Sequence, residues 1–236
     1  MDRQLFLLLN GSDSVFLDNC FRAITRTSTW IPLLVVLLFV VFKSFPTAKP
    51  LRSRLLSLLL FAVTFALVLT ICDQTASTLC KPLFHRLRPS HEPALYGLVD
   101  LVNGRRGGLY GFFSSHAANS FGLTTFAALT LRNRLSAITL YLWAALTSYS
   151  RIYLGYHYPG DILAGLLFGL LTGWLIYKLQ HRLFTNAPSA LSAPGTTSSS
   201  APSATSASPT AVASRYHLLL PATLILTLVI IAIAAI

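Results

Sequence analysis

Charged residues are scarce in this chain of 236 residues, where they account for 11% against 54% hydrophobic residues. Soluble domains usually contain roughly 25% charged residues. The scarcity of charge, together with a mean hydropathy of +0.64, excludes an ordinary soluble protein and predicts one that is embedded in a membrane. The length also leaves no room for a soluble catalytic domain beside a membrane bundle.

Two familiar kinds of site lack their sequence signals. The three cysteines, Cys20, Cys72 and Cys80, form neither a C-x-x-C pair nor the even number that a disulfide framework needs. Cys20 and Cys80 could still fall on the same side of the membrane. The glycine-rich stretch 104–111 is not followed by Gly-Lys-Ser or Gly-Lys-Thr, which excludes a Walker phosphate-binding loop.

Acidic residues are also few, seven against 18 lysines and arginines, which gives a net charge of +11. Such an excess can indicate nucleic-acid binding. Here the basic residues lie between hydrophobic stretches, so we expect no nucleic-acid partner. The positive-inside rule places three connections in the cytoplasm and residues 76–116 and 150–160 on the other side. The cytoplasmic connections contain Lys43, Lys49, Arg52 and Arg54; Arg132 and Arg134; and Lys178 and Arg182.

Six hydrophobic stretches are candidates for crossing a bilayer, which takes roughly 20 apolar residues per helix. We therefore predict an all-α fold, a polytopic transmembrane helical bundle of about six helices. Two of the stretches contain small polar residues, which are typical of helices packed inside a bundle. The six run over residues 29–45, 55–75, 117–131, 135–149, 161–179 and 218–236.

The two ends of the chain differ in composition from the bundle. Residues 1–28 mix the short apolar run Leu5 to Leu9 with charges of both signs, which predicts an N-terminal interfacial segment. That run is too short for the hydrophobic region of a signal peptide. Residues 183–215, rich in Ala, Ser, Thr and Pro, predict a flexible linker. This leaves 29–182 as the main transmembrane bundle and 216–236 as a C-terminal transmembrane helix.

Three polar clusters fall on the predicted non-cytoplasmic side. The first, Lys81 to Pro89, is a basic run of the kind that often anchors a protein to lipid headgroups. The second, Ser114, Ser115 and His116, directly precedes the third hydrophobic stretch. Hydroxyls and free N–H groups at a helix start form an anion site, although a plain serine N-cap is a common alternative.

The third cluster, Ser150 to Asp161, contains a histidine and an aspartate four residues apart, His157 and Asp161. That spacing lets the carboxylate reach the imidazole. Pro159 and Gly160 predict a helix start, so that His157 lies in a loop and Asp161 lies in the first turn of the next helix. A capping arrangement is the ordinary interpretation of such a pair.

Together the clusters resemble the signature of the type 2 phosphatidic acid phosphatase family, which reads K-x6-R-P, then P-S-G-H, then S-R-x5-H-x3-D. The first and third parts are matched at the family's spacing by Lys81, Arg88 and Pro89, and by Ser150, Arg151, His157 and Asp161. The second part departs from the signature. It keeps serine and histidine at Ser114 and His116 but has Phe113 for proline and Ser115 for glycine.

The resemblance, which covers roughly residues 50–180, implies a lipid phosphatase that works through a phosphohistidine intermediate. His157 would be the nucleophile, and Asp161 would fix its tautomer. His116 would protonate the departing oxygen and then activate a water molecule. Positive charge and hydrogen-bond donors would hold the phosphate, and the residues implied are Lys81, Arg88, Arg151, Ser114 and Ser115.

His116, His157 and Asp161 are also residue types that bind zinc. Their cationic neighbours would repel a divalent metal ion and attract a phosphate. We therefore expect catalysis with no metal ion and no other cofactor.

The resemblance favours undecaprenyl diphosphate as the substrate, with undecaprenyl phosphate as the product. The enzyme would lie in the bacterial inner membrane with its active site on the periplasmic face. Phosphatidic acid, phosphatidylglycerophosphate and lipid A phosphates are alternatives, because a groove for lipid tails has no readable sequence code. The expected partners are a membrane lipid phosphate and the bilayer, and the oligomeric state stays open.

Two other classes of protein compete with a lipid phosphatase. A non-enzymatic membrane transporter or lipid-binding protein could use the same basic cavity, but it would not need His116, His157 and Asp161 together. A vanadate-dependent haloperoxidase resembles the family at the anion site. Those enzymes are soluble, and the six hydrophobic stretches argue against that class.

Overall fold

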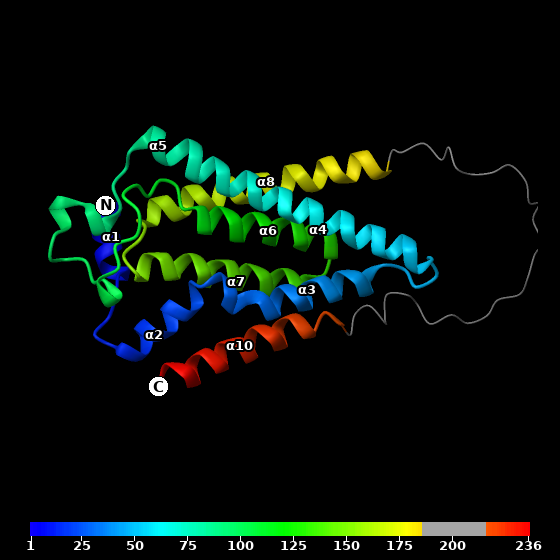
Figure 1. Ribbon diagram of the computed structural model, residues 1–236, viewed down its shortest axis with the longest axis horizontal. Coiled ribbons are helices and arrows are strands. Elements are labelled where there is room, and N and C mark those ends of the chain that lie inside the picture. Colours follow the sequence, from blue (N-terminus) through cyan, green and yellow to red (C-terminus); the bar gives the residue numbers. More distant parts are fainter. Residues whose placement is uncertain (186–215) are drawn as a thin grey trace, which may run out of the picture.

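The structure, a computed structural model, describes residues 1–185 and 216–236. Most of the predicted linker lies outside these residues. The elements assigned within them are helices, and an isolated bridge joins Leu87 to Tyr110. Figure 1 shows the long helices running side by side. The helices are α1 (Asp2–Leu9), α2 (Val15–Ile24), α3 (Ile31–Ser44), α4 (Leu51–Gln74), α5 (Lys81–Phe84), α6 (Ser115–Leu131), α7 (Arg134–Tyr153), α8 (Pro159–Thr185) and α10 (Leu219–Ala235).

Three described helical stretches have the length and hydropathy of a membrane crossing: Thr27–Ser44, Leu51–Phe84 and Pro159–Leu183. Helix α10 is apolar but has 17 residues, and α6 also has 17, many of them small or polar. The bundle is nearly all helical, as expected, but the count of six crossings is not confirmed. The difference arises because α6 and α7 bury much of their surface against other helices, where side chains need not be uniformly apolar.

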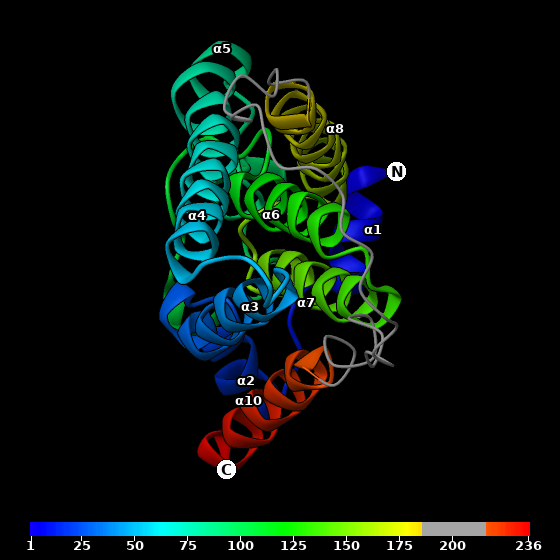
Figure 2. The ribbon, with the colours of Figure 1, turned by 90° about the vertical axis from the view of Figure 1, so that its right-hand side faces the viewer.

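The centre of the bundle is α6, which packs against α4, α7 and α8 (Figure 2). Gly165, Gly169 and Gly173 line the face of α8 that contacts α6. A Cβ atom at Gly169 would lie 2.4 Å from the carbonyl oxygen of Ala118. Small residues repeated every four positions let two helix backbones approach closely. The α6–α8 contact therefore depends on glycine.

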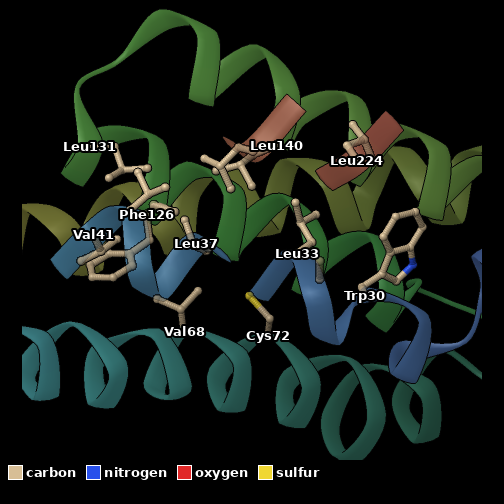
Figure 3. Packing of buried hydrophobic residues seen from close by; sticks show 14 of the residues in the cluster. Trp30, Leu33, Leu37, Val41, Val68, Cys72, Phe126, Leu131, Leu140 and Leu224 are labelled. Carbon is tan, nitrogen blue, oxygen red and sulfur yellow. The ribbon is translucent and has the colours of Figure 1, made fainter. Parts of the chain in front are cut away.

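A hydrophobic cluster joins α3 and α10 to the same bundle. Figure 3 shows Val68 and Cys72 pointing from α4 into this cluster, beneath Leu37 and Leu33 of α3. Helix α10 packs against α2, α3 and α7, and buries Leu224 in this cluster.

The N-terminal helix α1 lies at the end of the bundle where α6 and α8 begin (Figure 1). Phe6 of α1 is fully buried, with its ring edge-on to Tyr158 and the ring centroids 5.5 Å apart. The Asn10 side chain donates a hydrogen bond of 2.8 Å to the carbonyl oxygen of Tyr153. These contacts hold α1 against the turn between α7 and α8.

Replacing Gly169 with alanine tests the α6–α8 contact. Alanine is intrinsically the better helix former by about 1 kcal/mol, yet its methyl group would collide with the α6 backbone. We expect Gly169→Ala to lower the free energy of unfolding by about 1–3 kcal/mol, measured as a fall in the thermal midpoint in detergent. Leu167→Ala, which changes a 58% exposed side chain of α8, is the control and should shift the midpoint less. An unchanged or higher midpoint for Gly169→Ala would contradict the close contact.

Candidate active site

The three polar clusters of the sequence meet at one end of the bundle. The backbone N–H of Ser114, at the start of α6, donates to the carbonyl oxygen of Asp161 in α8 at 3.1 Å. The N–H of Gly111 donates to the carbonyl oxygen of Arg86 at 2.9 Å, which ties the first cluster to the loop before α6. Residues from all three clusters, between positions 81 and 161, therefore surround one site.

Asp161 is the best connected side chain of the site, and it is fully buried. Its Oδ1 lies 2.7 Å from Nη1 of Arg86, and its Oδ2 accepts a 3.0 Å hydrogen bond from the N–H of Tyr158. The latter bond caps α8, which begins at Pro159 as the sequence predicts. The same Oδ2 lies 3.5 Å from Nδ1 of His157. Asp161 thus combines the expected capping role with contact to the imidazole.

His157 lies in the loop before α8 and is only 1% exposed. Burial, and next the positive charges of Arg151, Arg88 and Lys81, lower the pKa of His157 well below its usual range. The imidazole is therefore neutral near pH 7, and its contact with Asp161 is not an ion pair. Nδ1 is the ring nitrogen beside the carboxylate, although it forms no hydrogen bond in the described structure, which leaves Nε2 for a substrate.

Lys81, Arg88 and Arg151 supply positive charge to the site. Lys81 Nζ lies 3.5 Å from the hydroxyl of Ser115, and Arg88 Nε donates to the carbonyl oxygen of Tyr110 at 3.1 Å. Within the described residues none of these three cations forms an ion pair. Uncompensated charge of this kind attracts an anion and repels a metal cation.

Aromatic and hydroxyl contacts hold the two arginines in place. The Arg151 guanidinium stacks over the Tyr156 ring at 4.3 Å from its centroid, and that of Arg88 lies 6.0 Å from the same centroid. Arg151 also donates to the hydroxyl of Thr25 at 2.6 Å, from the end of α2. Its Nε atom is buried without a hydrogen-bond partner in the described structure, so it remains a donor for a ligand.

Ser114, Ser115 and His116 occupy the N-terminus of α6. Ser114 is the N-cap, and its hydroxyl accepts from the N–H of Ala117 at 3.5 Å. Ser115 has a helical backbone and is not among the residues with positive φ, so serine in place of the family's glycine introduces no strain. His116 lies within electrostatic range of Arg151, Lys81, Arg88 and His157. The structure thus groups all eight residues singled out in the sequence.

Two further residues, Arg86 and Asp2, join the site, and no motif in the sequence assigned a role to either. Arg86 forms ion pairs with both Asp161 and Asp2 of α1. The other Asp2 oxygen accepts from the N–H of Gly160 at 2.9 Å. Arg86 therefore holds the Asp161 carboxylate that faces His157. Asp2 of α1 supplies a second negative charge for Arg86. The one sequence signal for Arg86 is its position two residues before Arg88, which places both arginines in the same loop beside the site.

The donor set does not favour a metal. Within the described ranges, no group of three or more His, Cys, Asp or Glu side chains is arranged to hold a metal ion. His116, His157 and Asp161 share the site with Lys81, Arg88 and Arg151, which form no ion pair in the described part of the chain. That environment fits a phosphate better than zinc.

Comparison with known proteins agrees with this geometry. Residues 55–185 match the PAP2 superfamily. A lipid A 4′-phosphatase from Bacteroides thetaiotaomicron is 41% identical over 83% of this chain and 84% of its own length, and one from Porphyromonas gingivalis is 39% identical over 76% and 72%. An undecaprenyl-diphosphatase from Bacillus subtilis is 32% identical over only 30% of this chain and 36% of its own length.

The chain belongs to the PAP2 superfamily. It is a membrane-embedded hydrolase that acts on lipid phosphates, as the resemblance implied. The preference for undecaprenyl diphosphate gains only distant support, because that relative matches less than a third of the chain.

The lowered pKa of His157 gives a pH prediction. A depressed pKa keeps the imidazole neutral into the acidic range, so removing a neighbouring positive charge should let it protonate at higher pH. We expect Arg88→Gln to move the acidic limb of the kcat/KM profile upward by about one pH unit, apart from its lower activity. Ionisation of the substrate phosphate is common to both enzymes and cancels in the comparison.

Arg132→Gln is the matched control for that experiment, because Arg132 lies between α6 and α7 and donates to the Tyr177 hydroxyl. Its profile should coincide with that of the wild type. An acidic limb that stays in place in Arg88→Gln would show that Arg88 does not set the protonation of the group being titrated.

Proposed function

We propose that this protein is a lipid A 4′-phosphatase that removes phosphate through a phosphohistidine intermediate, without a metal ion. The observation that supports lipid A as the substrate is the extent of similarity. Two lipid A 4′-phosphatases match at 41% and 39% identity over 83% and 76% of the chain. The membrane would be the bacterial inner membrane. The site would face the extracytoplasmic side, because the positive-inside rule makes the basic connections at the opposite end, around Lys49, Arg132 and Arg182, cytoplasmic once the cations of the site itself are set aside.

The first chemical step is transfer of the phosphoryl group to His157. Lys81, Arg88 and Arg151 would bind the phosphate oxygens and stabilise the charge of the transition state. The N–H groups at the start of α6 would add directional bonds. Nε2 of His157 attacks phosphorus as the bond to the sugar oxygen breaks, because Nδ1 is turned toward Asp161.

Asp161 and His116 would complete the cycle. The Asp161 carboxylate, held by Arg86, keeps the proton on Nδ1 and stabilises the positive charge of the phosphorylated imidazole. His116 donates a proton to the departing sugar oxygen. It then takes a proton from water, which attacks phosphorus, releases inorganic phosphate and restores His157.

If the two histidines have separate roles, substituting each should affect the phosphoenzyme intermediate differently. With an aryl phosphate, whose leaving group needs no proton, His116→Gln should accumulate phosphoenzyme because hydrolysis of the intermediate is slowed. His157→Gln should form none and lose at least about 10³-fold in kcat. The measurement is protein-bound phosphate after an alkaline quench, in which phosphohistidine survives. His85→Asn, at an exposed residue with φ of 47°, is the control, and phosphoenzyme in His157→Gln would refute the assignment.

A panel of lipid substrates tests the proposed function itself. We expect purified protein to release phosphate from lipid A 4′-phosphate with a kcat/KM at least about tenfold above that for undecaprenyl diphosphate or phosphatidic acid. Activity should survive EDTA, because cations of the protein replace a metal, and vanadate should inhibit as a phosphate mimic. Preference for undecaprenyl diphosphate would overturn the substrate, and loss of activity with EDTA would overturn the metal-free mechanism.

A further inference from the structure

A cavity of about 390 Å³ lies between α3, α4, α6 and α7, next to the proposed active site. Its walls are largely apolar, and Figure 3 shows four of the lining residues, Trp30, Leu33, Leu37 and Leu140. His116, the proposed general acid, also lines it. The volume falls within the range of roughly 300–1,000 Å³ that is usual for ligand pockets. The cavity therefore continues the phosphate site into the apolar interior.

The apolar walls carry polar atoms that have no partner. Asn119 Oδ1, Trp143 Nε1 and Thr147 Oγ1 are buried without a hydrogen bond in the described structure, and all three residues line this cavity. Asp73 lines it too, and its carboxylate accepts from the Asn119 amide at 3.3 Å. More than nine in ten buried polar groups in proteins are paired. Three unpaired groups around one cavity point to a ligand that brings the missing donors and acceptors.

The donor and acceptor types of these groups limit which chemical class of ligand the cavity can bind. The Trp143 N–H can only donate, the Asn119 oxygen can only accept, and the Thr147 hydroxyl can do both. Asp73 adds a negative charge that would repel a second phosphate. A polyprenyl chain carries neither donors nor acceptors, so it would leave these groups unpaired.

We propose that this cavity binds the acyl-linked part of the substrate, in which hydroxyl and amide groups join hydrocarbon chains to a phosphorylated sugar, and that it thereby selects against polyprenyl phosphates. The proposal rests on the proposed function and adds the residues that decide the substrate. A site built to hydrogen-bond a substrate discriminates strongly against an analogue that lacks those groups.

Two nearly shape-preserving variants test the proposal. Thr147→Val removes one hydroxyl, and Trp143→Phe removes the indole N–H. For each, kcat/KM is measured on lipid A 4′-phosphate and on undecaprenyl diphosphate in the same detergent micelles. We expect the ratio of the two values to fall about tenfold per variant, as the loss of one hydrogen bond predicts. Thermal midpoints of both variants are recorded, so that a folding defect is seen directly.

Thr70→Val is the matched control, because Thr70 lies on α4, is exposed and donates to the carbonyl oxygen of Ala66 in its own helix. Its ratio should equal that of the wild type. A fall of at least about fivefold in the ratio for both cavity variants supports the proposal, and any smaller change in either folded variant overturns it. If the proposed function itself were wrong, the wild-type protein would show no preference for lipid A 4′-phosphate. That result is distinct from an unchanged ratio in the variants.

Discussion

The close approach of α6 to α8 is the constraint on which the site depends. Three glycines of α8 remove the side chains that would separate the two backbones, and Gly169 leaves no space even for a methyl group. The helix starts therefore meet, and the Ser114 N–H bonds the Asp161 carbonyl oxygen. A phosphate at this point would face the N-terminus of α6, three cations and an imidazole. Lys81 and Arg151 lie on helices, whereas Arg88 lies in the connection between α5 and α6.

Electrostatics then divides the charged residues into two groups. Arg86 is neutralised by Asp2 and Asp161 and serves the scaffold. Lys81, Arg88 and Arg151 lack acidic partners among the described residues and are left for a ligand. Keeping such cations together in a partly buried site is costly unless an anion arrives. Burial, together with these charges, lowers the pKa of His157 and keeps the imidazole unprotonated, which suits a nucleophile that must attack a negatively charged phosphate.

The N-terminal segment, predicted to lie at the membrane interface, also packs against the site. Buried Phe6 anchors α1 beside Tyr158, and Asp2 bridges Arg86 to the backbone of Gly160. A chain of contacts thus runs from the second residue of the protein through Arg86 to the Asp161 carboxylate and on to His157. Helix α1 therefore belongs to the support of the site, although no signature motif lies within it.

The sequence by itself determined the class of protein and supplied the residues proposed for its site, because charge scarcity, hydrophobic length and motif spacing can be read without knowing which helices pack together. It also located the start of α8, since Pro159 and Gly160 act on their own backbone. Tertiary structure alone decided the partnership of Arg86 with Asp2, the reduced number of long apolar crossings and the cavity with its unpaired polar atoms. These features depend on which helix faces fit together, and packing between residues far apart in the chain leaves no periodic mark in either segment.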